Sequence, residues 1–480
     1  MALTLIILGL ALVFYCLEIR RLTGSLYLTN RSVHKLCCSG PYRFVRHPVT
    51  IGMILIVLGL ALLWESFYAL IVALMISAFL VIFAMLYVEK IQSSSEEDYL
   101  KYRKLVPSFI PQFSRKYPFE HSTCISWQFM LVSHVLKLLI VILAPTRVIN
   151  RRAVTENVPV ALAIIHQSHY DGPLVFYAMN RYFRFIGTNL VFEKVPLLRG
   201  MGVIPVKRYK VDMAPMRELI KTVRSGYSIG IAPEAGRTWD GKPICIRAEI
   251  WKLLKILNVP VVPVKFYGIQ RLWPRWADKP SFFGLPEVEF FDPISPDDPL
   301  IKEKLEKAFN KTDPSFEKPY RDYRGISRLL WRCPKCGAIG SIRGRKRAVE
   351  CKECDLKWLK PSVDFIISAH RKILPDNMKV QFPVEDTVTY NGEECYARIY
   401  PTYATIGDFK LEFDRIRRSS IELNHENIFG TESSEPVRFI PSFSALMWKE
   451  IIDYQVRFEL LKGDYHTYYW DDVEPEKKGS

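Results

Sequence analysis

The sequence predicts an α/β domain with a largely parallel sheet, carried on a helical transmembrane domain and followed by a cysteine-rich module and a small β-rich domain. Long apolar segments near the N-terminus indicate the first part, strand-like runs alternating with amphipathic helices indicate the second, and paired cysteines indicate the third. The expected boundaries are residues 1–120, 121–325, 326–360 and 361–480.

Composition narrows the functional classes. The 480-residue chain has a formal net charge of +16, which favours a polyanionic partner such as nucleic acid or an anionic membrane. The apolar N-terminus favours the membrane, so we disfavour nucleic acid as the partner. Ten cysteines in a chain of this length do not form a disulfide framework, and four of them occur in Cys-x-x-Cys pairs, which indicates a reducing compartment.

The N-terminal domain contains three apolar segments, at Leu3–Leu17, Val49–Leu63 and Phe67–Val88. The third is long enough to span a bilayer, and the second is marginal. Cations lie between the first and second segments, at Arg20, Arg21, Arg31, Lys35, Arg43 and Arg46. By the positive-inside rule this loop is cytoplasmic, as is everything after Val88. The sequence therefore predicts an integral membrane protein with its active site on the cytoplasmic face.

A second pattern in this domain runs from Gly40-Pro41-Tyr42-Arg43-Phe44-Val45-Arg46-His47-Pro48 through Glu89 to Tyr99-x-x-Tyr102. It resembles the isoprenylcysteine carboxyl methyltransferase family of membrane enzymes. The resemblance implies that Arg46, His47 and Glu89 bind S-adenosylmethionine. Thr50 and Lys90 depart from the family pattern, and the competing interpretation is a membrane anchor in which Arg46 pairs with Glu89 or lipid phosphate.

The α/β domain is predicted from the order of its elements. Strand-like runs at residues 158–165, 202–206, 228–232 and 259–264 are separated by expected helices, two of them at 212–224 and 247–257. The prolines of the last strand argue against a place in an ordinary central ladder. Gly226-Tyr227-Ser228-Ile229-Gly230 matches the hydrolase elbow, but that motif needs a strand before its serine, whereas Ser228 is expected to begin one.

The first of these strands leads into His166-Gln167-Ser168-His169-Tyr170-Asp171. Gly172-Pro173 reads as the start of a helix, so His166 and Asp171 lie on a strand-to-helix turn. On such a turn the carboxylate can bond one imidazole nitrogen and raise the basicity of the other. The pattern is typical of a general base, although a pair of satisfied loop residues is the simpler alternative.

Three later motifs favour the catalytic interpretation. Gly202-Val203-Ile204-Pro205-Val206-Lys207-Arg208, Pro233-Glu234-Ala235-Gly236-Arg237 and Val259-Pro260-Val261-Val262-Pro263 follow in this order. With the His-x4-Asp pattern they resemble the glycerolipid acyltransferase family, the family of lysophosphatidic acid acyltransferases, over residues 125–300. Ala235-Gly236 stand where that family usually has Gly-Thr.

The resemblance implies a membrane-bound O-acyltransferase of phospholipid synthesis or remodelling. Its acceptor would be a lysophospholipid such as 1-acylglycerol 3-phosphate, and its donor acyl-CoA or acyl carrier protein. His166 would be the general base, oriented by Asp171, and Glu234 would position the acceptor or brace Arg237. The acceptor phosphate would be bound by Lys207, Arg208, Gly236 and Arg237. Two alternatives are an S-adenosylmethionine-dependent membrane methyltransferase fused to this domain and a non-catalytic membrane scaffold.

The segment Ile125–Leu143 is apolar but interrupted by polar residues, which favours a helix lying in the membrane interface and seating the domain on the lipid bilayer. Further along, Cys333-x-x-Cys336 and Cys351-x-x-Cys354 have the spacing of a zinc ribbon with a structural Zn²⁺. Its basic loop, Arg343–Arg347, would suit nucleic acid or, as we prefer, a docking module that contacts lipid phosphates. Strands are expected at 395–413 and 458–470, and a helix at 444–454.

Overall fold

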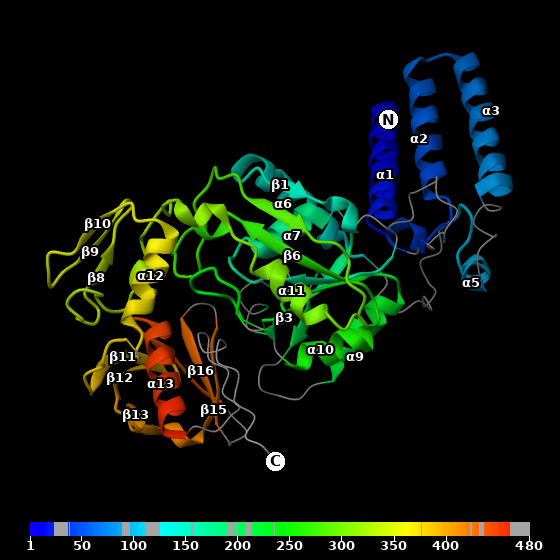
Figure 1. The fold of residues 1–480 in the computed structure, drawn as a ribbon. Helices are drawn as coiled ribbons and strands as arrows, with labels where there is room; N and C mark the ends of the chain where they lie inside the picture. Colours follow the sequence, from blue (N-terminus) through cyan, green and yellow to red (C-terminus); the bar gives the residue numbers. More distant parts are fainter. Residues whose placement is uncertain are drawn as a thin grey trace.

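Four parts follow one another along the chain in the structure, a computed structural model (Figure 1). Apolar helices come first, and then a mixed α/β domain, a three-stranded ribbon and a seven-stranded antiparallel sheet. The structure describes residues 1–23, 37, 39–88, 97–111, 125–154, 158–179, 181–189, 192, 196, 200–206, 213–234, 236–244, 246, 248–375, 377–422, 425–431 and 436–460.

The N-terminal part consists of α1 (Ala2–Thr23), α2 (Pro48–Leu63) and α3 (Phe67–Phe83), which continues as a π-helical turn, followed by the short helix α5 (Glu97–Leu105). Among the described residues, two helical stretches are long and apolar enough to cross a membrane, Ala2–Thr23 and Phe67–Leu86. The shorter α2 falls below that length, as its sequence predicts.

Three glycines allow α1 and α2 to pack closely. A Cβ atom on Gly9 would lie 2.6 Å from the carbonyl oxygen of Gly52, and one on Gly59 would lie 2.9 Å from that of Ala2. Both distances are shorter than real Cβ contacts, so the helices could not approach this closely with larger residues. Close packing of this kind stabilises helix pairs in lipid, where apolar burial contributes little.

The α/β domain is built on a sheet with the strand order β1-β7-β6-β2-β5-β3-β4. Neighbouring strands are parallel except for β6 and β7, so the predicted largely parallel sheet is present. Ser228 begins β5, as its sequence predicts. The strands are β1 Arg147–Ile149, β2 Ala161–Ile164, β3 Phe183–Thr188, β4 Ile204–Val206, β5 Ser228–Ile231, β6 Val261–Tyr267 and β7 Glu287–Phe290.

The expectation that prolines keep β6 out of a central ladder is wrong, because β6 lies between β2 and β7. Pro263 lies where the pairing on the β7 side is interrupted, between the bridge of Val261 to Ile294 and the ladder that begins at Val264. Its carbonyl still accepts a hydrogen bond from the Phe291 N–H at 3.0 Å. The nitrogen of Pro263 therefore lies at a break in the β6–β7 ladder, so its lack of an N–H costs this ladder no hydrogen bond.

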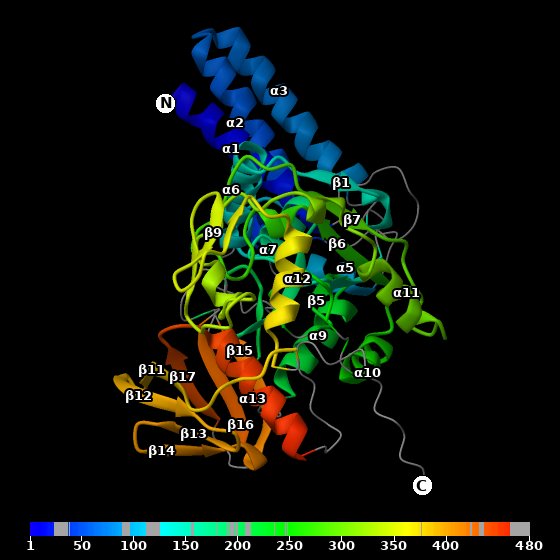
Figure 2. The ribbon, with the colours of Figure 1, turned by 60° about the vertical axis from the view of Figure 1, so that its left-hand side comes forward.

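Helices cover both faces of this sheet (Figures 1 and 2). Helix α7 lies on one face with α6 packed beside it, while α9 and α10 lie on the other, as right-handed crossovers require. The helices are α6 Trp127–Leu143, α7 Asp171–Met179, α9 Ala214–Arg224, α10 Ala248–Leu257 and α11 Ile301–Phe309.

The hydrophobic core of the α/β domain reaches into the end of α1. Cys16, Ile19 and Leu22 are buried in the same cluster as the strands β2, β5 and β6. The carbonyl of Leu22 also accepts a hydrogen bond from the Tyr182 N–H at 3.0 Å. The α/β domain therefore packs directly on α1, a helix that is long enough to span a membrane.

After the α/β domain come the ribbon, β8 to β10, and the helix α12, and then a sheet in the order β14-β13-β12-β11-β17-β16-β15, crossed by α13 (Figure 2). The ribbon strands are β8 Ile342–Gly344, β9 Ala348–Cys351 and β10 Lys357–Leu359, and α12 is Val363–Ile373. The rest are β11 Val384–Tyr390, β12 Glu393–Ile399, β13 Tyr403–Ile406, β14 Phe409–Glu412, β15 Ile416–Glu422, β16 Glu426–Thr431, β17 Val437–Pro441 and α13 Ala445–Leu460.

Two features of the C-terminal part differ from the sequence expectations. The described start of the expected strand at 458–470, residues 458–460, is the end of α13, and the rest lies outside the described residues. Helix α13 has apolar residues at helical spacing, and these residues are buried: Leu446, Met447, Trp448, Ile451 and Ile452. This periodicity favours a helix more strongly than the short strand-like alternation that begins at residue 458 favours a strand. The strands β11 and β15 to β17 were not predicted.

The ribbon and the C-terminal sheet share one hydrophobic core, which also takes in part of the α/β domain. Trp239 and Trp276, both fully buried, belong to the same cluster as Trp331 at the base of the ribbon and Trp448 of α13. Trp239 follows the Pro-Glu-x-x-Arg motif by only a few residues. The conformation of that motif is therefore linked to packing against the C-terminal part.

This shared core leads to an expectation for stability. We expect Trp276→Ala to destabilise the C-terminal part by about 3–5 kcal/mol, the usual cost of truncating a buried tryptophan. Urea-dependent trypsin cleavage of the full chain in detergent measures this change. Leu359→Ala, at a side chain that is 74% exposed, is the control and should leave the cleavage midpoint unchanged. Equal midpoints for the two variants would contradict a shared core.

Candidate active site and metal centre

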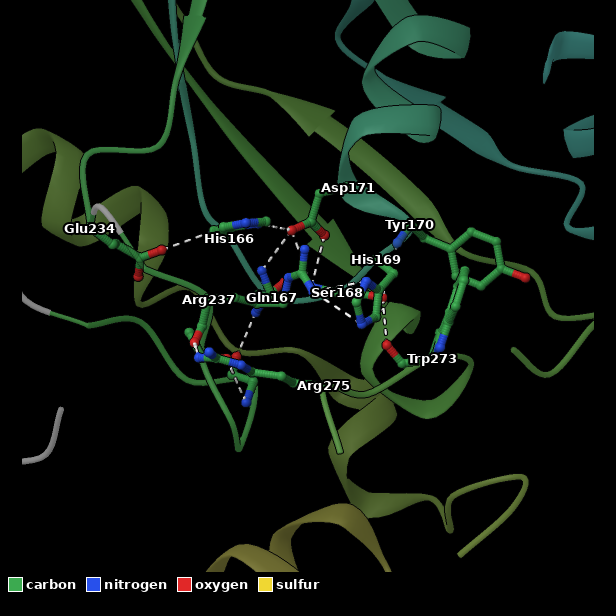
Figure 3. A network of polar contacts seen from close by, with 12 residues as sticks. His166, Gln167, Ser168, His169, Tyr170, Asp171, Glu234, Arg237, Trp273 and Arg275 are labelled. Atoms are coloured by element: carbon green, nitrogen blue, oxygen red, sulfur yellow. Dashed lines mark hydrogen bonds and ion pairs between the residues drawn. The ribbon is translucent and has the colours of Figure 1, made fainter. Parts of the chain in front are cut away.

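The turn between β2 and α7 holds the His166–Asp171 pair (Figure 3). The Nδ1 atom of His166 lies 2.6 Å from Oδ2 of Asp171. The helix begins at Asp171, whereas Pro173 was expected at its first position. Pro173 is third, and it is tolerated there because the first turn of a helix leaves its N–H groups without intrahelical partners.

The Asp171 carboxylate also holds the backbone of the turn. It accepts hydrogen bonds from the N–H groups of Gln167, at 2.8 Å, and Ser168, at 3.0 Å. An ionised carboxylate only accepts, so its bond to His166 requires the imidazole hydrogen on Nδ1. The lone pair of His166 is consequently on Nε2, as a general base needs.

His166 is accessible enough to act on a substrate, because 32% of its side chain is exposed. Burial lowers its pKa below the ordinary 6.5, the Arg237 guanidinium lowers it further, and the bond to Asp171 opposes both effects. The imidazole is therefore neutral at neutral pH. A neutral, oriented and accessible imidazole can accept a proton from a hydroxyl group.

Glu234 lies in the loop after β5, and its two carboxyl oxygens bridge two backbone segments. Oε2 accepts the N–H of His166 at 2.8 Å and Oε1 accepts the N–H of Ile244 at 2.6 Å. Burial raises the pKa of Glu234 to about 8, against the opposing effect of these two N–H groups. We expected Glu234 to position the acceptor or brace Arg237; the bonds in the structure connect it to the backbone of the turn that carries His166.

Arg237 contacts a histidine that the sequence analysis did not single out. Its Nη1 atom lies 2.8 Å from Nδ1 and 3.0 Å from Nε2 of His169. Burial and then the guanidinium itself lower the pKa of His169 to about 2, so this imidazole is neutral. The His169 ring packs on that of Trp273, 4.7 Å between centroids. Gly236 is half-buried beside Arg237, and Ala235 lies outside the described residues.

Arg275 is a second residue that sequence reasoning missed. This buried side chain donates from Nη1 to the carbonyl of Arg237 and from Nη2 to the carbonyl of Ile421 in β15, the latter at 2.8 Å. Its guanidinium also lies over the Trp239 ring, 4.6 Å from the centroid. Trp239 lies 36 residues before Arg275 in the chain, so no local sequence pattern indicates this contact.

Lys207 and Arg208 lie outside the described residues, directly after the end of β4. Thr188 pairs with Val206 in the parallel ladder of β3 and β4. The carboxyl ends of parallel strands meet at one edge of a sheet, so β4 ends at the same edge as β2 and β5, which lead to His166 and Glu234.

The predicted cofactor group of the N-terminal domain is partly described. Arg46 donates from Nη2 to the Ser108 hydroxyl at 2.6 Å, and buried His47 packs its ring 5.3 Å from that of Phe109. Both residues are thus held by one segment close to α5. Glu89 lies outside the described residues.

Four cysteines of the ribbon form a group with the geometry of a metal site. The Sγ atoms of Cys333, Cys336, Cys351 and Cys354 lie within 4.8 Å of one another, and two of the pairs are 3.8 Å apart. A tetrahedral Zn²⁺ with Zn–S bonds of about 2.3 Å places its sulfurs about 3.8 Å apart. These residues therefore fit a closed, structural zinc site.

Comparisons with known proteins match two segments of the chain to enzyme families. Residues 145–267 match the acyltransferase family model, and residues 1–93 match the phospholipid methyltransferase family model. The chain therefore contains an acyltransferase domain and a methyltransferase-like N-terminal domain. A solved structure, the 1-acyl-sn-glycerophosphate (LPA) acyltransferase PlsC from Thermotoga maritima, is 19% identical. It aligns with 49% of this chain and 89% of that chain, with a TM-score of 0.32. No curated protein matches.

The ribbon geometry gives an expected metal content. The purified, freshly reduced chain should contain one tightly bound zinc, and Cys333→Ser should lose it. Because structural zinc contributes on the order of 10 kcal/mol to folding such a unit, loss of the metal should make residues 330–360 sensitive to protease. Metal analysis by mass spectrometry measures the zinc. Cys395→Ser, at a cysteine outside the cluster, should retain it, and a zinc-free wild-type chain would contradict the assignment.

The bonds of Glu234 lead to a second expectation. In Glu234→Gln one oxygen becomes an NH₂ donor that faces a backbone N–H, and an unpaired buried donor costs about 1–3 kcal/mol. Amide hydrogen exchange at His166 or Ile244 should therefore become faster, as measured by mass spectrometry of peptides that cover the two loops. Glu303→Gln, at an exposed position of α11, is the control. Unchanged exchange in Glu234→Gln would show that these bonds do not hold the turn.

Proposed function

We propose that this protein transfers a fatty acyl group from a thioester to the hydroxyl of a lysophospholipid such as 1-acylglycerol 3-phosphate. The observation that carries the proposal is the accessible, neutral His166 bonded to Asp171 at 2.6 Å inside the segment that matches the acyltransferase family. The acceptor class rests on the resemblance of the four sequence motifs to the glycerolipid acyltransferase family.

In the proposed reaction no side chain acts as the nucleophile. Nε2 of His166 takes the proton of the acceptor hydroxyl while its oxygen attacks the thioester carbonyl. The C–S bond then breaks, and the leaving thiolate takes the proton back from the imidazolium. Asp171 stabilises that imidazolium, and Glu234 keeps the backbone of His166 in place. General-base catalysis of this kind contributes roughly 10²–10⁴ to the rate.

The remaining rate enhancement would come from binding both substrates and stabilising charge. Arg237 is the described candidate for the acceptor phosphate, and its contact with neutral His169 orients the guanidinium without neutralising it. Lys207 and Arg208, directly after β4, are the further candidates. Guanidinium groups suit this task because they bind phosphate oxygens two at a time.

The proposed location is a cellular membrane, with His166 on the cytoplasmic face. The two span-length apolar helices support a membrane location, and the cations after the first apolar segment support the orientation by the positive-inside rule. Acyl-CoA and acyl carrier protein, the two candidate donors, are found on that side. A lysophospholipid would reach the site from the bilayer.

The direct test is acyl transfer by the purified full chain in lipid nanodiscs, with labelled acyl-CoA and a panel of lysophospholipids. We expect His166→Ala to lose activity by roughly 10²-fold or more, as the loss of a general base requires, and Asp171→Asn to lose most of it. Both variants should stay folded and membrane-bound. A folded His166→Ala variant with more than about a tenth of wild-type turnover would contradict general-base catalysis by this residue.

The pH profile supplies a control. The base must be neutral, and its pKa lies below 6.5, so kcat/KM should hold level as the pH falls through 6.5 and decline only below it. Arg237→Gln removes a positive charge that lowers this pKa, so it should move the decline to higher pH. No movement would mean that the profile reports a different group.

A second candidate function, S-adenosylmethionine-dependent methyl transfer, is favoured by the match of residues 1–93 to the phospholipid methyltransferase family. Arg46 could pair with the cofactor carboxylate and Glu89 with its amine. When bound, the cofactor would supply an activated methyl group. The competing role for the domain is that of a membrane anchor, and Lys90, a cation where the resembled family has an anion, favours it.

Equilibrium binding of radiolabelled S-adenosylmethionine to the solubilised chain decides between these roles. A working methyltransferase domain should bind the cofactor saturably, and Glu89→Ala should abolish the binding. Glu65→Ala, in the turn between α2 and α3, is the control and should leave it intact. No binding at millimolar cofactor would leave the domain as an anchor.

A further inference from the structure

A loop of the α/β domain exposes large apolar side chains to an unusual degree. Phe283 is 70% exposed and Leu285 is 81% exposed, and the neighbouring Phe282 is also exposed. Single exposed apolar residues are common, but three within four positions form a contiguous patch, and such patches mark interaction surfaces. The loop leads directly into β7, the strand that pairs with the edge strand β1.

The loop is held in a defined shape. Phe283 has a φ of 59°, which is rare for an aromatic residue, and its N–H donates to the carbonyl of Leu143 at the end of α6, at 2.6 Å. Arg321 donates to the carbonyls of Phe282, at 3.4 Å, and Phe283, at 3.0 Å. Bonds on both sides fix the backbone, so the outward direction of these side chains is built into the fold.

The loop continues an apolar surface of α6. Exposed apolar residues recur along α6 and form one broad helical face, at Leu131, Val135, Leu138, Leu139, Val141 and Ile142. Helix α6 in turn contacts α1: Nε2 of His134 lies 3.7 Å from the Glu18 carboxylate, and the His134 ring lies 6.1 Å from that of Phe14. The apolar surface therefore runs from a span-length helix, along α6, to Phe283 and Leu285.

We propose that the Phe282–Leu285 loop inserts into the membrane leaflet on which α6 lies, as a second contact of the acyltransferase domain with lipid. The partner is a phospholipid bilayer. Both views of the fold support this partner, because α6 and β1 lie on the side of the α/β domain that faces α1 to α3 (Figures 1 and 2). The backbone N–H of Arg147 in β1 donates to the Pro286 carbonyl beside the loop. The Arg147 guanidinium is 75% exposed and lies 3.6 Å from the Glu287 carboxylate, a loose surface pair that leaves the cation accessible to lipid phosphates.

The same loop is connected to the candidate active site. The Tyr170 hydroxyl donates to the Ser281 carbonyl at 3.3 Å, and the Tyr170 ring packs edge-on against Trp273, 5.4 Å between centroids. Tyr170 belongs to the turn that carries His166 (Figure 3). This connection to the site rests on the proposed acyl transfer. Given that function, the loop holds the turn that carries His166 at the membrane surface, where the lysolipid and the product are dissolved.

Photo-crosslinking tests the membrane contact without using activity. The full chain is placed in nanodiscs that contain fluorescent phosphatidylcholine, with p-benzoylphenylalanine in place of Phe283, Leu285 or, as the control, Tyr396. Tyr396 is 49% exposed and lies on β12 of the C-terminal sheet, which both views place far from α1 to α3. We expect lipid adducts at the two loop positions and none at Tyr396. Adducts at the loop no stronger than at Tyr396 would overturn the proposal.

An activity measurement then tests the connection to the site. Phe283→Ser with Leu285→Ser should lower the turnover of a long-chain lysolipid in the bilayer by roughly tenfold, as expected when apolar membrane contact is lost. Turnover of a short-chain, water-soluble acceptor should be unchanged. Equal losses on both acceptors would mean that the loop supports the fold and not lipid access. Lipid adducts in a wild-type chain that transfers no acyl group would leave the membrane contact standing and overturn only the proposed function.

Discussion

The candidate active site depends on the buried carboxylate of Asp171. This one group accepts two backbone N–H bonds from its own turn and orients the His166 imidazole at 2.6 Å. Glu234 holds the same turn from the opposite side through the N–H of His166. A turn that is fixed by two buried carboxyl groups cannot reorient easily, so the His166 imidazole keeps one orientation. For the general base that we propose, this fixed orientation would leave little ordering cost for the reaction itself.

The parts of this site that are local in sequence could be predicted. His166 and Asp171 are five residues apart, so turn chemistry alone suggests their contact. The four ribbon cysteines have a spacing that only a few structures use. The span-length helix at Phe67–Leu86 follows from composition, whereas α1 extends beyond the apolar segment expected at Leu3–Leu17. In each case the signal is contained within a window of about twenty residues, which is the range over which periodicity and spacing are informative.

Long-range contacts explain what was missed. Arg275 acts through backbone carbonyls of Arg237 and Ile421, and carbonyls carry no sequence signal. Glu234 was assigned to Arg237 or the acceptor, whereas its partners are main-chain N–H groups that any residue would supply. From the sequence, Pro263 argued against a central strand. The break in the β6–β7 ladder that accommodates this proline depends on tertiary structure, so the sequence pattern does not reveal it. Sequence patterns indicate which side chains are present, but not which backbone groups they meet.

The bridge made by Arg275 has a consequence for the order in which the molecule is completed during synthesis. Ile421 follows Arg275 by 146 residues. A nascent chain that has produced the whole parallel sheet still lacks one of the two carbonyls that this arginine bonds, and also the tryptophan of α13 that completes the core around Trp239. The acyltransferase domain therefore reaches its final form only after the last sheet has emerged from the ribosome, and its site is among the last parts of the protein to mature.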